Sequence, residues 1–186
     1  MQVPEVIERQ LSVGEQVLWY GRPRQGLVLR AGDAFFIPFT LLWCATVLNG
    51  ARAAIARDHV AAFPLIYLPF ALVALYLLVG RFVLDIERRS TTDYAVTRDR
   101  ILIVSHGFRK AVTSLPLATL ADITLSTTAS GAGSIVFGRD GFSWMNDPAF
   151  GTRGQAAPRF ELIADAEAVH ALIRETQRRK EAKRAL

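Results

Sequence analysis

The sequence predicts an α+β membrane protein in which a two-helix transmembrane hairpin is followed by a small antiparallel β-barrel or sandwich with a C-terminal α-helix. Two observations predict this class. Apolar residues are concentrated between residues 34 and 79, although charged residues make up 21 % of the chain. From residue 91 onward, short segments rich in Val, Ile and Thr follow one another, as is typical of strands. We therefore expect an N-terminal segment at 1–33, the hairpin at 34–80 and a folded domain at 81–186.

The run from Val60 to Val79 contains no charged residue and predicts the second span, at about 60–79. At about 1.5 Å of rise per residue, a helix of this length matches a hydrocarbon core of roughly 30 Å. A helix on the surface of a soluble protein would need a polar stripe, which this run lacks. Pro64 and Pro69 disfavour a helix, but transmembrane helices tolerate proline. Arg81 follows where a cation can reach the headgroups, so we expect it to anchor the span at the membrane interface.

The first apolar run, Ala34 to Asn49, is shorter than the second. Alone it would also fit a buried helix or a re-entrant segment. Beside the second run, an antiparallel helical hairpin is the better interpretation, with the first span at about 34–54 and Arg52 near its end. The connector is too short to hold a domain.

Arginine counts predict the orientation of the hairpin. Positively charged flanks stay in the cytoplasm, and the two outer flanks carry more arginine than the connector. Both termini are therefore expected to be cytoplasmic. The flanks contain Arg22, Arg24, Arg30, Arg81, Arg88 and Arg89, whereas the connector contains Arg52 and Arg57.

The segment before the hairpin does not resemble a signal peptide, because acidic residues precede any apolar core. Residues 14–23 favour an extended segment followed by a turn. Trp19 and Tyr20 suit a membrane interface, where an apolar ring and a polar edge are both satisfied. Packing of these two rings on the folded domain is an equally good interpretation.

The domain after the hairpin is expected to be an antiparallel meander, because its short apolar segments are separated by turn residues. Residues 82–86 either add a strand or continue the second helix. A C-terminal helix is expected at about 165–184, with Ala166, Val169, Leu172 and Ile173 on its buried face. The expected strands are 91–97, 100–105, 111–117, 121–126, 134–138 and 159–163.

Several local motifs carry a family resemblance, namely Tyr94-Ala-Val-Thr97 with Arg100-Ile-Leu-Ile, Ser114-Leu-Pro-Leu117, Gly133-Ser-Ile-Val-Phe-Gly138 and, upstream, Leu18-Trp19-Tyr20-Gly21-Arg22-Pro23. These motifs resemble the bacterial branch of the pleckstrin-homology (PH) superfamily. The resemblance covers most of the chain. It implies a PH-like domain tethered to the bacterial inner membrane, and it implies no activity, because fold does not fix function.

Residues with catalytic chemistry do not converge in the sequence. The three histidines, at 59, 106 and 170, lack metal-ligand spacing, and Cys44 lies inside an apolar run. The glycines at 130–141 lack the Gly-Lys-Ser/Thr of a phosphate loop. We therefore expect no enzyme activity, no cofactor, no metal and no small-molecule substrate. An enzymatic alternative would need Asp85 or Glu87 acting with Arg88.

Basic residues early in the domain and an aromatic loop are the candidate contacts. Cations near an anionic bilayer contribute on the order of 1 kcal/mol each, but topology signalling and a solvated face are the simpler explanation of these residues. The loop at 139–158 is long for a hairpin connection, and is either a binding surface or a flap that closes the barrel. The candidate lipid or partner contacts are Arg88, Arg89, Arg109, Lys110, Phe142, Trp144 and Met145, and the candidate interface anchors are Trp19, Tyr20 and Arg81.

These features favour a non-enzymatic, inner-membrane-anchored binding module that engages a protein partner, a second copy of itself or anionic lipid at the cytoplasmic face. The alternative is an assembly or scaffold subunit of a larger membrane complex, in which the hairpin packs against other membrane helices. Nucleic acid is not an expected partner, because aromatic residues and cations do not alternate on any expected strand face.

Overall fold

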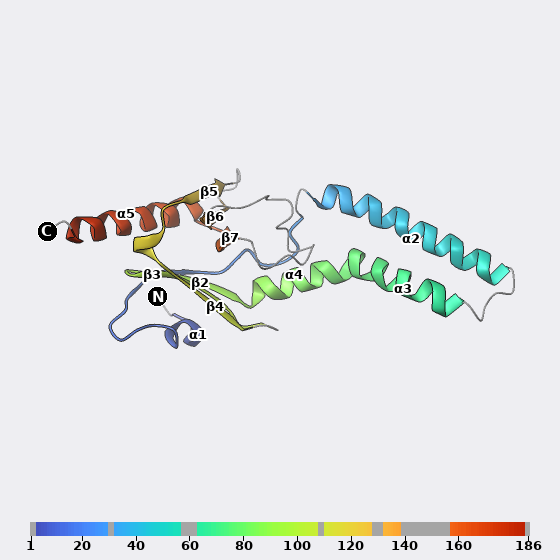
Figure 1. Cartoon of the computed structure of the whole chain (residues 1–186), viewed down its shortest axis with the longest axis horizontal. Coiled ribbons are helices and arrows are strands. Elements are labelled where there is room, and N and C mark those ends of the chain that lie inside the picture. Colours follow the sequence, from blue (N-terminus) through green and yellow to red (C-terminus); the bar gives the residue numbers. More distant parts are fainter. Residues whose placement is uncertain are drawn as a thin grey trace. The chain divides into compact units, whose positions relative to one another are not determined.

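A computed structural model describes residues 3–29, 32–56, 63–107, 110–127, 132–138 and 157–184. The chain is α+β, with two long apolar helices, two antiparallel sheets and a C-terminal helix (Figure 1). It divides into two compact units. The hairpin unit is Gly26–Ile86, and the sheet unit combines Met1–Gln25 with Glu87–Leu186.

The hairpin unit contains two helices that are long and apolar enough to cross a membrane. The first is α2, Asp33–Ala56. The second begins as α3, Phe63–Leu75, passes through a π-helical turn, η1, Tyr76–Gly80, and continues as α4, Arg81–Ser90. Helices α2 and α3 contact each other, and Gly50 permits a close approach, because an ideal Cβ at this position would lie 2.5 Å from the ring of Tyr67.

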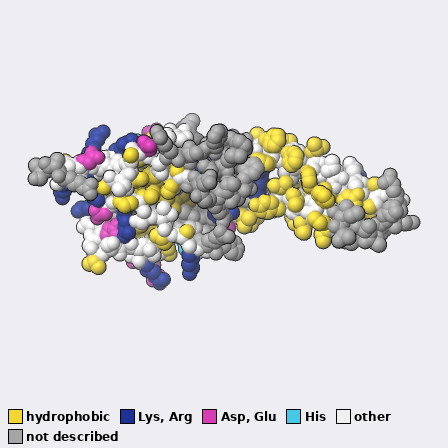
Figure 2. Space-filling view, in the orientation of Figure 1, with side chains coloured by type: hydrophobic (Ala, Val, Ile, Leu, Met, Phe, Trp, Pro, Cys, Tyr) yellow, Lys and Arg dark blue, Asp and Glu magenta, His cyan; other side chains and the backbone are white. Residues whose placement is uncertain are grey.

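The hairpin helices expose apolar side chains instead of burying them. Only 6 % of the most apolar window of each helix is buried. Figure 2 shows hydrophobic side chains over the surface of these helices. Of the two interpretations of residues 82–86, the structure has the helix, because α4 continues directly from η1 as far as Ser90.

In the described part of the sheet unit, seven strands lie close to the expected segments. A four-stranded sheet has the order β1-β2-β3-β4, and a three-stranded sheet has the order β5-β6-β7. All pairings are antiparallel. The strands are β1 Val17–Gly21, β2 Thr92–Thr97, β3 Arg100–Ser105, β4 Ala111–Pro116, β5 Ile123–Thr127, β6 Gly133–Phe137 and β7 Arg159–Ile163.

Strand β1 lies before the hairpin in the chain but belongs to the sheet that follows it. Tyr20 pairs with Ala95 of β2, and the ring of Trp19 lies 5.6 Å from that of Phe160. Of the two interpretations of Trp19 and Tyr20, packing on the folded domain is therefore the one seen in the structure. The hairpin is inserted between the first two strands of a single sheet, so the N-terminal segment is part of the sheet unit.

A backbone hydrogen bond of 2.9 Å from Arg24 N to Leu162 O joins the end of β1 to β7 and so connects the two sheets. The 3-10 turn η2, Leu117–Thr119, follows β4, and helix α5, Ala166–Arg184, packs against η2, β5 and β6. The amide of Gln177 on α5 donates to the carbonyl oxygens of Leu117 at 3.0 Å and Leu120 at 2.9 Å. Helix α5 thus covers the opening between β4 and β5.

Two apolar clusters hold the sheet unit together. The larger lies between the sheets and α5, and includes Phe160 and the predicted helix residues Ala166, Val169 and Ile173, whereas the predicted Leu172 is only half-buried. The smaller lies on the outer face of the four-stranded sheet, where Ile7 of the short helix α1, Glu5–Glu8, is fully buried. Both faces of β2 and β3 are therefore covered, which explains the nearly continuous burial of β2.

Candidate functional site

The structure gives Arg89 a structural role. Only 3 % of this residue is exposed, and its Nη1 donates to Arg24 O at 2.9 Å. The backbone carbonyl of Arg89 accepts from Nε2 of Gln25 at 3.1 Å. The guanidinium therefore holds the segment after β1 against the end of α4. Arg88 is half-buried and has an interaction of its own, whereas Lys110 is exposed.

The interface anchor Arg81 is held inside the hairpin unit. Its Nη2 lies 2.8 Å from Oδ1 of Asp33, and its guanidinium lies over the rings of Phe36 at 5.4 Å and Phe82 at 4.5 Å. Both charged side chains are almost fully buried. The sequence pattern pointed to the cation but not to its carboxylate partner. The remaining predicted contacts, Arg109, Phe142, Trp144 and Met145, lie outside the described residues.

A polar cluster around Asp93 was not predicted from the sequence. The Asp93 side chain is fully buried, and its Oδ1 accepts hydrogen bonds of 2.6 Å from both Tyr20 Oη and Arg22 Nε. Nδ1 of His106 lies 3.3 Å from the other carboxylate oxygen. Burial and the bond to Asp93 raise the pKa of Tyr20, and the same carboxylate raises the pKa of Arg22. An acidic residue at the start of an otherwise apolar strand is the signal that could have pointed to this cluster.

A second polar cluster fixes the N-terminal segment to the β2–β3 hairpin. Arg100 donates from Nε and Nη2 to the two carboxylate oxygens of Glu15, at 2.9 and 2.7 Å. Glu15 also accepts from Thr97 Oγ1 at 2.7 Å and from the backbone N–H of Ser12 at 2.8 Å. The bond from Arg100, followed in weight by those from Ser12 and Thr97, lowers the pKa of Glu15 to about 2 against the effect of burial. The Glu15 carboxylate is therefore ionised at neutral pH, and both of its oxygens accept hydrogen bonds, which suits a structural role.

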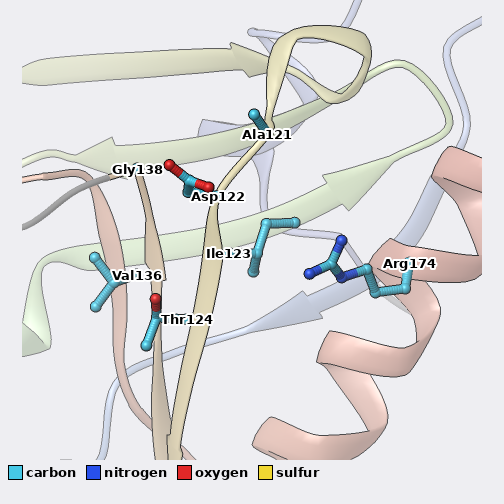
Figure 3. A pocket seen from close by; sticks show the side chains of 7 residues that line it. All are labelled: Ala121, Asp122, Ile123, Thr124, Val136, Gly138 and Arg174. Carbon is cyan, nitrogen blue, oxygen red and sulfur yellow. The ribbon is translucent and has the colours of Figure 1, made fainter.

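A pocket of about 600 Å³ lies between the start of β5, the end of β6 and α5 (Figure 3). The side chain of Arg174 reaches from α5 towards Ile123, and the carboxylate of Asp122 lies on the far side of β5 from it. The pocket offers a cation, a carboxylate, a hydroxyl and apolar surface. Its lining residues are Ala121, Asp122, Ile123, Thr124, Val136, Gly138 and Arg174.

The two buried polar clusters connect segments of the fold, whereas the pocket is open and carries an exposed arginine. Within the described part of the chain, no group of three or more His, Cys, Asp or Glu residues could hold a metal ion. Comparison of the chain with protein-family models, with curated proteins and with solved structures gave no match. A function must therefore be inferred from the chain's own residues.

Proposed function

We propose that this chain is a non-enzymatic binding module of the bacterial inner membrane, in which a transmembrane hairpin is inserted between the first two strands of a cytoplasmic PH-like domain. The observation that carries the proposal is the pair of apolar helices that follow one another in the chain and leave their side chains exposed. The module would engage a protein partner, a second copy or anionic lipid.

The exposure of the helices supports a membrane location. Phe35 and Leu42 on α2 are 68 % and 65 % exposed, and Leu72 and Leu75 on α3 are similarly exposed. Each buried apolar side chain contributes roughly 1.5–3 kcal/mol, so a water-soluble protein would be expected to cover such a surface. A lipid bilayer covers it on all sides, and the surplus of arginine on the outer flanks favours the cytoplasmic side for both termini.

The arrangement of the sheet unit supports the PH-like assignment. Four- and three-stranded antiparallel sheets enclose one core, and a C-terminal helix covers the opening between β4 and β5. The motifs that resemble PH proteins occupy β2, β3, the end of β4 and β6. Charged groups that could have suggested catalysis, such as Asp93 and Glu15, are instead bonded to neighbouring strands and loops.

Cysteine accessibility in intact cells tests the topology. In a Cys44→Ala background, a membrane-impermeant maleimide should label His59→Cys from outside and should label Ser143→Cys only after permeabilisation. Labelling of Ser143→Cys in intact cells would overturn the cytoplasmic location. Release of the protein by alkaline washing would exclude the transmembrane hairpin itself.

The scaffold alternative is tested by purification after mild detergent extraction. A stoichiometric membrane-protein partner that remains bound to the hairpin would favour an assembly subunit. A chain that purifies alone, and whose sheet unit binds an added ligand, would favour the binding module.

A further inference from the structure

We infer that the hairpin pairs with a second copy of itself through the face of α2 that points away from α3, with Asn49 of the two copies hydrogen-bonded to each other inside the membrane. This inference rests on the proposed membrane location of the hairpin, and it names the partner of one hairpin face. It combines three observations: a polar side chain exposed on an apolar helix, a heptad spacing around that side chain, and the lack of a hydrogen-bond partner for it within the described chain.

Helix α2 has one face that is covered by α3 (Figure 1). On this face, Nε1 of Trp43 donates to the carbonyl oxygen of Phe70 at 3.3 Å. One heptad later, Gly50 approaches α3 closely. Successive residues lie about 100° apart around a helix, so residues two positions further on, Ala45 and Arg52, point to the opposite side.

This opposite side carries a stripe of residues spaced alternately by three and four positions, which we call the outer stripe. The outer stripe consists of Leu42, Ala45, Asn49, Arg52 and Ala56, and all five are exposed. Such spacing gives a helix one continuous seam, as in a coiled coil, and most transmembrane helix pairs cross at a similar angle. The two alanines allow a second helix to approach closely.

Asn49 is the residue that decides what the outer stripe binds. Its side chain is exposed and takes part in no hydrogen bond within the described chain, whereas Thr46 Oγ1 nearby donates to Trp43 O at 2.7 Å. Counted from Asp33, Asn49 lies about 24 Å along the helix, which is inside a hydrocarbon core of roughly 30 Å. Lipid chains cover apolar side chains there, but they offer an amide no hydrogen bond, and this is unfavourable.

A second copy of the chain supplies the missing partner. The carboxamide of asparagine is both a donor and an acceptor, so two such groups can bond to each other. Two copies inserted with the same topology place identical residues at the same depth, so a two-fold axis normal to the membrane brings Asn49 next to the partner's Asn49. A single asparagine at a seam position also fixes the register and the number of helices in coiled coils.

Arg52 sets the outer limit of the contact. It lies about 4.5 Å beyond Asn49 along the helix, near the end of the hydrocarbon core, where an arginine side chain can reach the headgroups. Water and ions at this depth screen the repulsion between the two guanidinium groups. We therefore expect the two helices to pack tightly from Leu42 to Asn49 and to separate at Arg52. A partner helix that carries a carboxylate at this depth is the competing occupant.

Disulfide trapping in native membranes tests the face. In a Cys44→Ala background, oxidation with copper phenanthroline should convert Leu42→Cys into a covalent dimer of the full chain. Leu41→Cys is the matched control, because Leu42 and Leu41 are 65 % and 56 % exposed and lie at nearly the same depth. Leu41→Cys should give at least about fivefold less dimer, since Leu41 lies outside the seam. Equal yields, or Leu42→Cys joined to a different protein, would overturn the inference.

Sedimentation equilibrium of the full chain in density-matched detergent micelles tests the amide. Asn49→Val should weaken dimerisation about tenfold, the effect of losing one interhelical hydrogen bond, and Asn49→Gln should restore most of the affinity. Thr46→Val is the matched control and should change the dissociation constant by less than about twofold, because the Thr46 hydroxyl already has a partner in its own helix. A monomeric wild-type chain, or equal effects of the two valine substitutions, would overturn the inference.

Failure of this inference can be distinguished from failure of the proposed function. Alkaline washing of the same membranes measures insertion, and maleimide labelling of His59→Cys measures topology. A chain that is inserted with the expected topology but is monomeric overturns the pairing and leaves the membrane-anchored module standing. A chain that alkaline washing releases overturns both.

Discussion

The hydroxyl group of Tyr20 donates a 2.6 Å hydrogen bond to Asp93, a residue 73 positions further along the chain. Tyr20 lies on the strand that precedes the helical hairpin and Asp93 on the strand that follows it. Arg22 bonds to the same carboxylate oxygen. The strands that precede and follow the hairpin in the chain are thus joined by a buried polar contact as well as by the β1–β2 ladder.

Asp93→Ala is expected to destabilise the sheet unit by about 2–3 kcal/mol, because the buried carboxylate is a charged acceptor for two short hydrogen bonds. Tyr20→Phe removes one of these bonds and should cost about 1 kcal/mol. Thermal unfolding of the purified full chain, followed by tryptophan fluorescence, measures both. If the two variants lose the same stability, the contacts of Arg22 and His106 with Asp93 do not stabilise the fold.

The Glu15–Arg100 contact predicts a pH dependence of stability. The pKa of Glu15 is about 2 in the folded chain, below the ordinary value of 4.5, so folding favours the ionised form. The contribution of the ionised Glu15 to the free energy of unfolding is complete above about pH 4.5 and is lost as the pH falls towards about 2. A shift of this size corresponds to roughly 3 kcal/mol. The Glu15 side chain is only 4 % exposed, but that of Arg100 is 26 % exposed, so solvent screening makes this value an upper bound.

Glu15→Gln should therefore lower the temperature midpoint of unfolding at neutral pH. The midpoint of this variant should also change less than that of the wild type between pH 4.5 and 2. Glu5→Gln is the matched control, because the Glu5–Arg9 pair is largely exposed and should contribute less than about 0.5 kcal/mol. If the wild-type and Glu15→Gln curves remain parallel over this range, the ionised contact does not stabilise the fold.

The Arg81–Asp33 pair in the hairpin unit predicts strong non-additivity. Arg81→Leu or Asp33→Ala alone leaves a nearly buried charge without its partner, at a cost of about 3–5 kcal/mol. The double variant removes both charges and should be more stable than either single variant. Thermal stability of the four proteins in one detergent gives the coupling energy. Additive losses in the double variant would show that the two charges do not stabilise each other.

The strands and the C-terminal helix were predicted well because their signals are local. Alternating Val, Ile and Thr segments and their turn residues lie within a few positions of each other, as do the apolar residues of α5. The apolar character of the two hairpin helices is equally local, and it was confirmed. The continuation of the second helix beyond residue 80 remained open, because residues 82–86 are short enough to fit a strand as well.

Pairings across the hairpin could not be read from the sequence. The partner of β1 is β2, on the other side of the insertion, so no local pattern distinguishes Trp19 packed in a core from Trp19 at a membrane interface. Arg89 and Arg100 look like surface cations in the sequence, but long-range contacts with Arg24 O and Glu15 hold them in the fold.

Because the hairpin is inserted between two strands of the sheet unit, we predict that the sheet unit folds without the hairpin. Deleting Gly26–Ile86 and joining Gln25 to Glu87 by a short Gly-Ser linker should give a folded, water-soluble domain. Both ends of the cut belong to one compact unit, and Gln25 already donates to Arg89 O at 3.1 Å, so the linker closes a short gap at little entropic cost.

The matched truncation begins at Glu87 and lacks residues 1–25. It should aggregate, because it loses β1, the ring of Trp19 and the side chain of Ile7, which cover both faces of the four-stranded sheet. Soluble yield, size-exclusion profile and tryptophan emission distinguish the two proteins. A domain without residues 1–25 that stays monomeric, with cooperative unfolding, would show that β1 is dispensable. The hairpin would then be a detachable N-terminal anchor and not an insertion on which the fold depends.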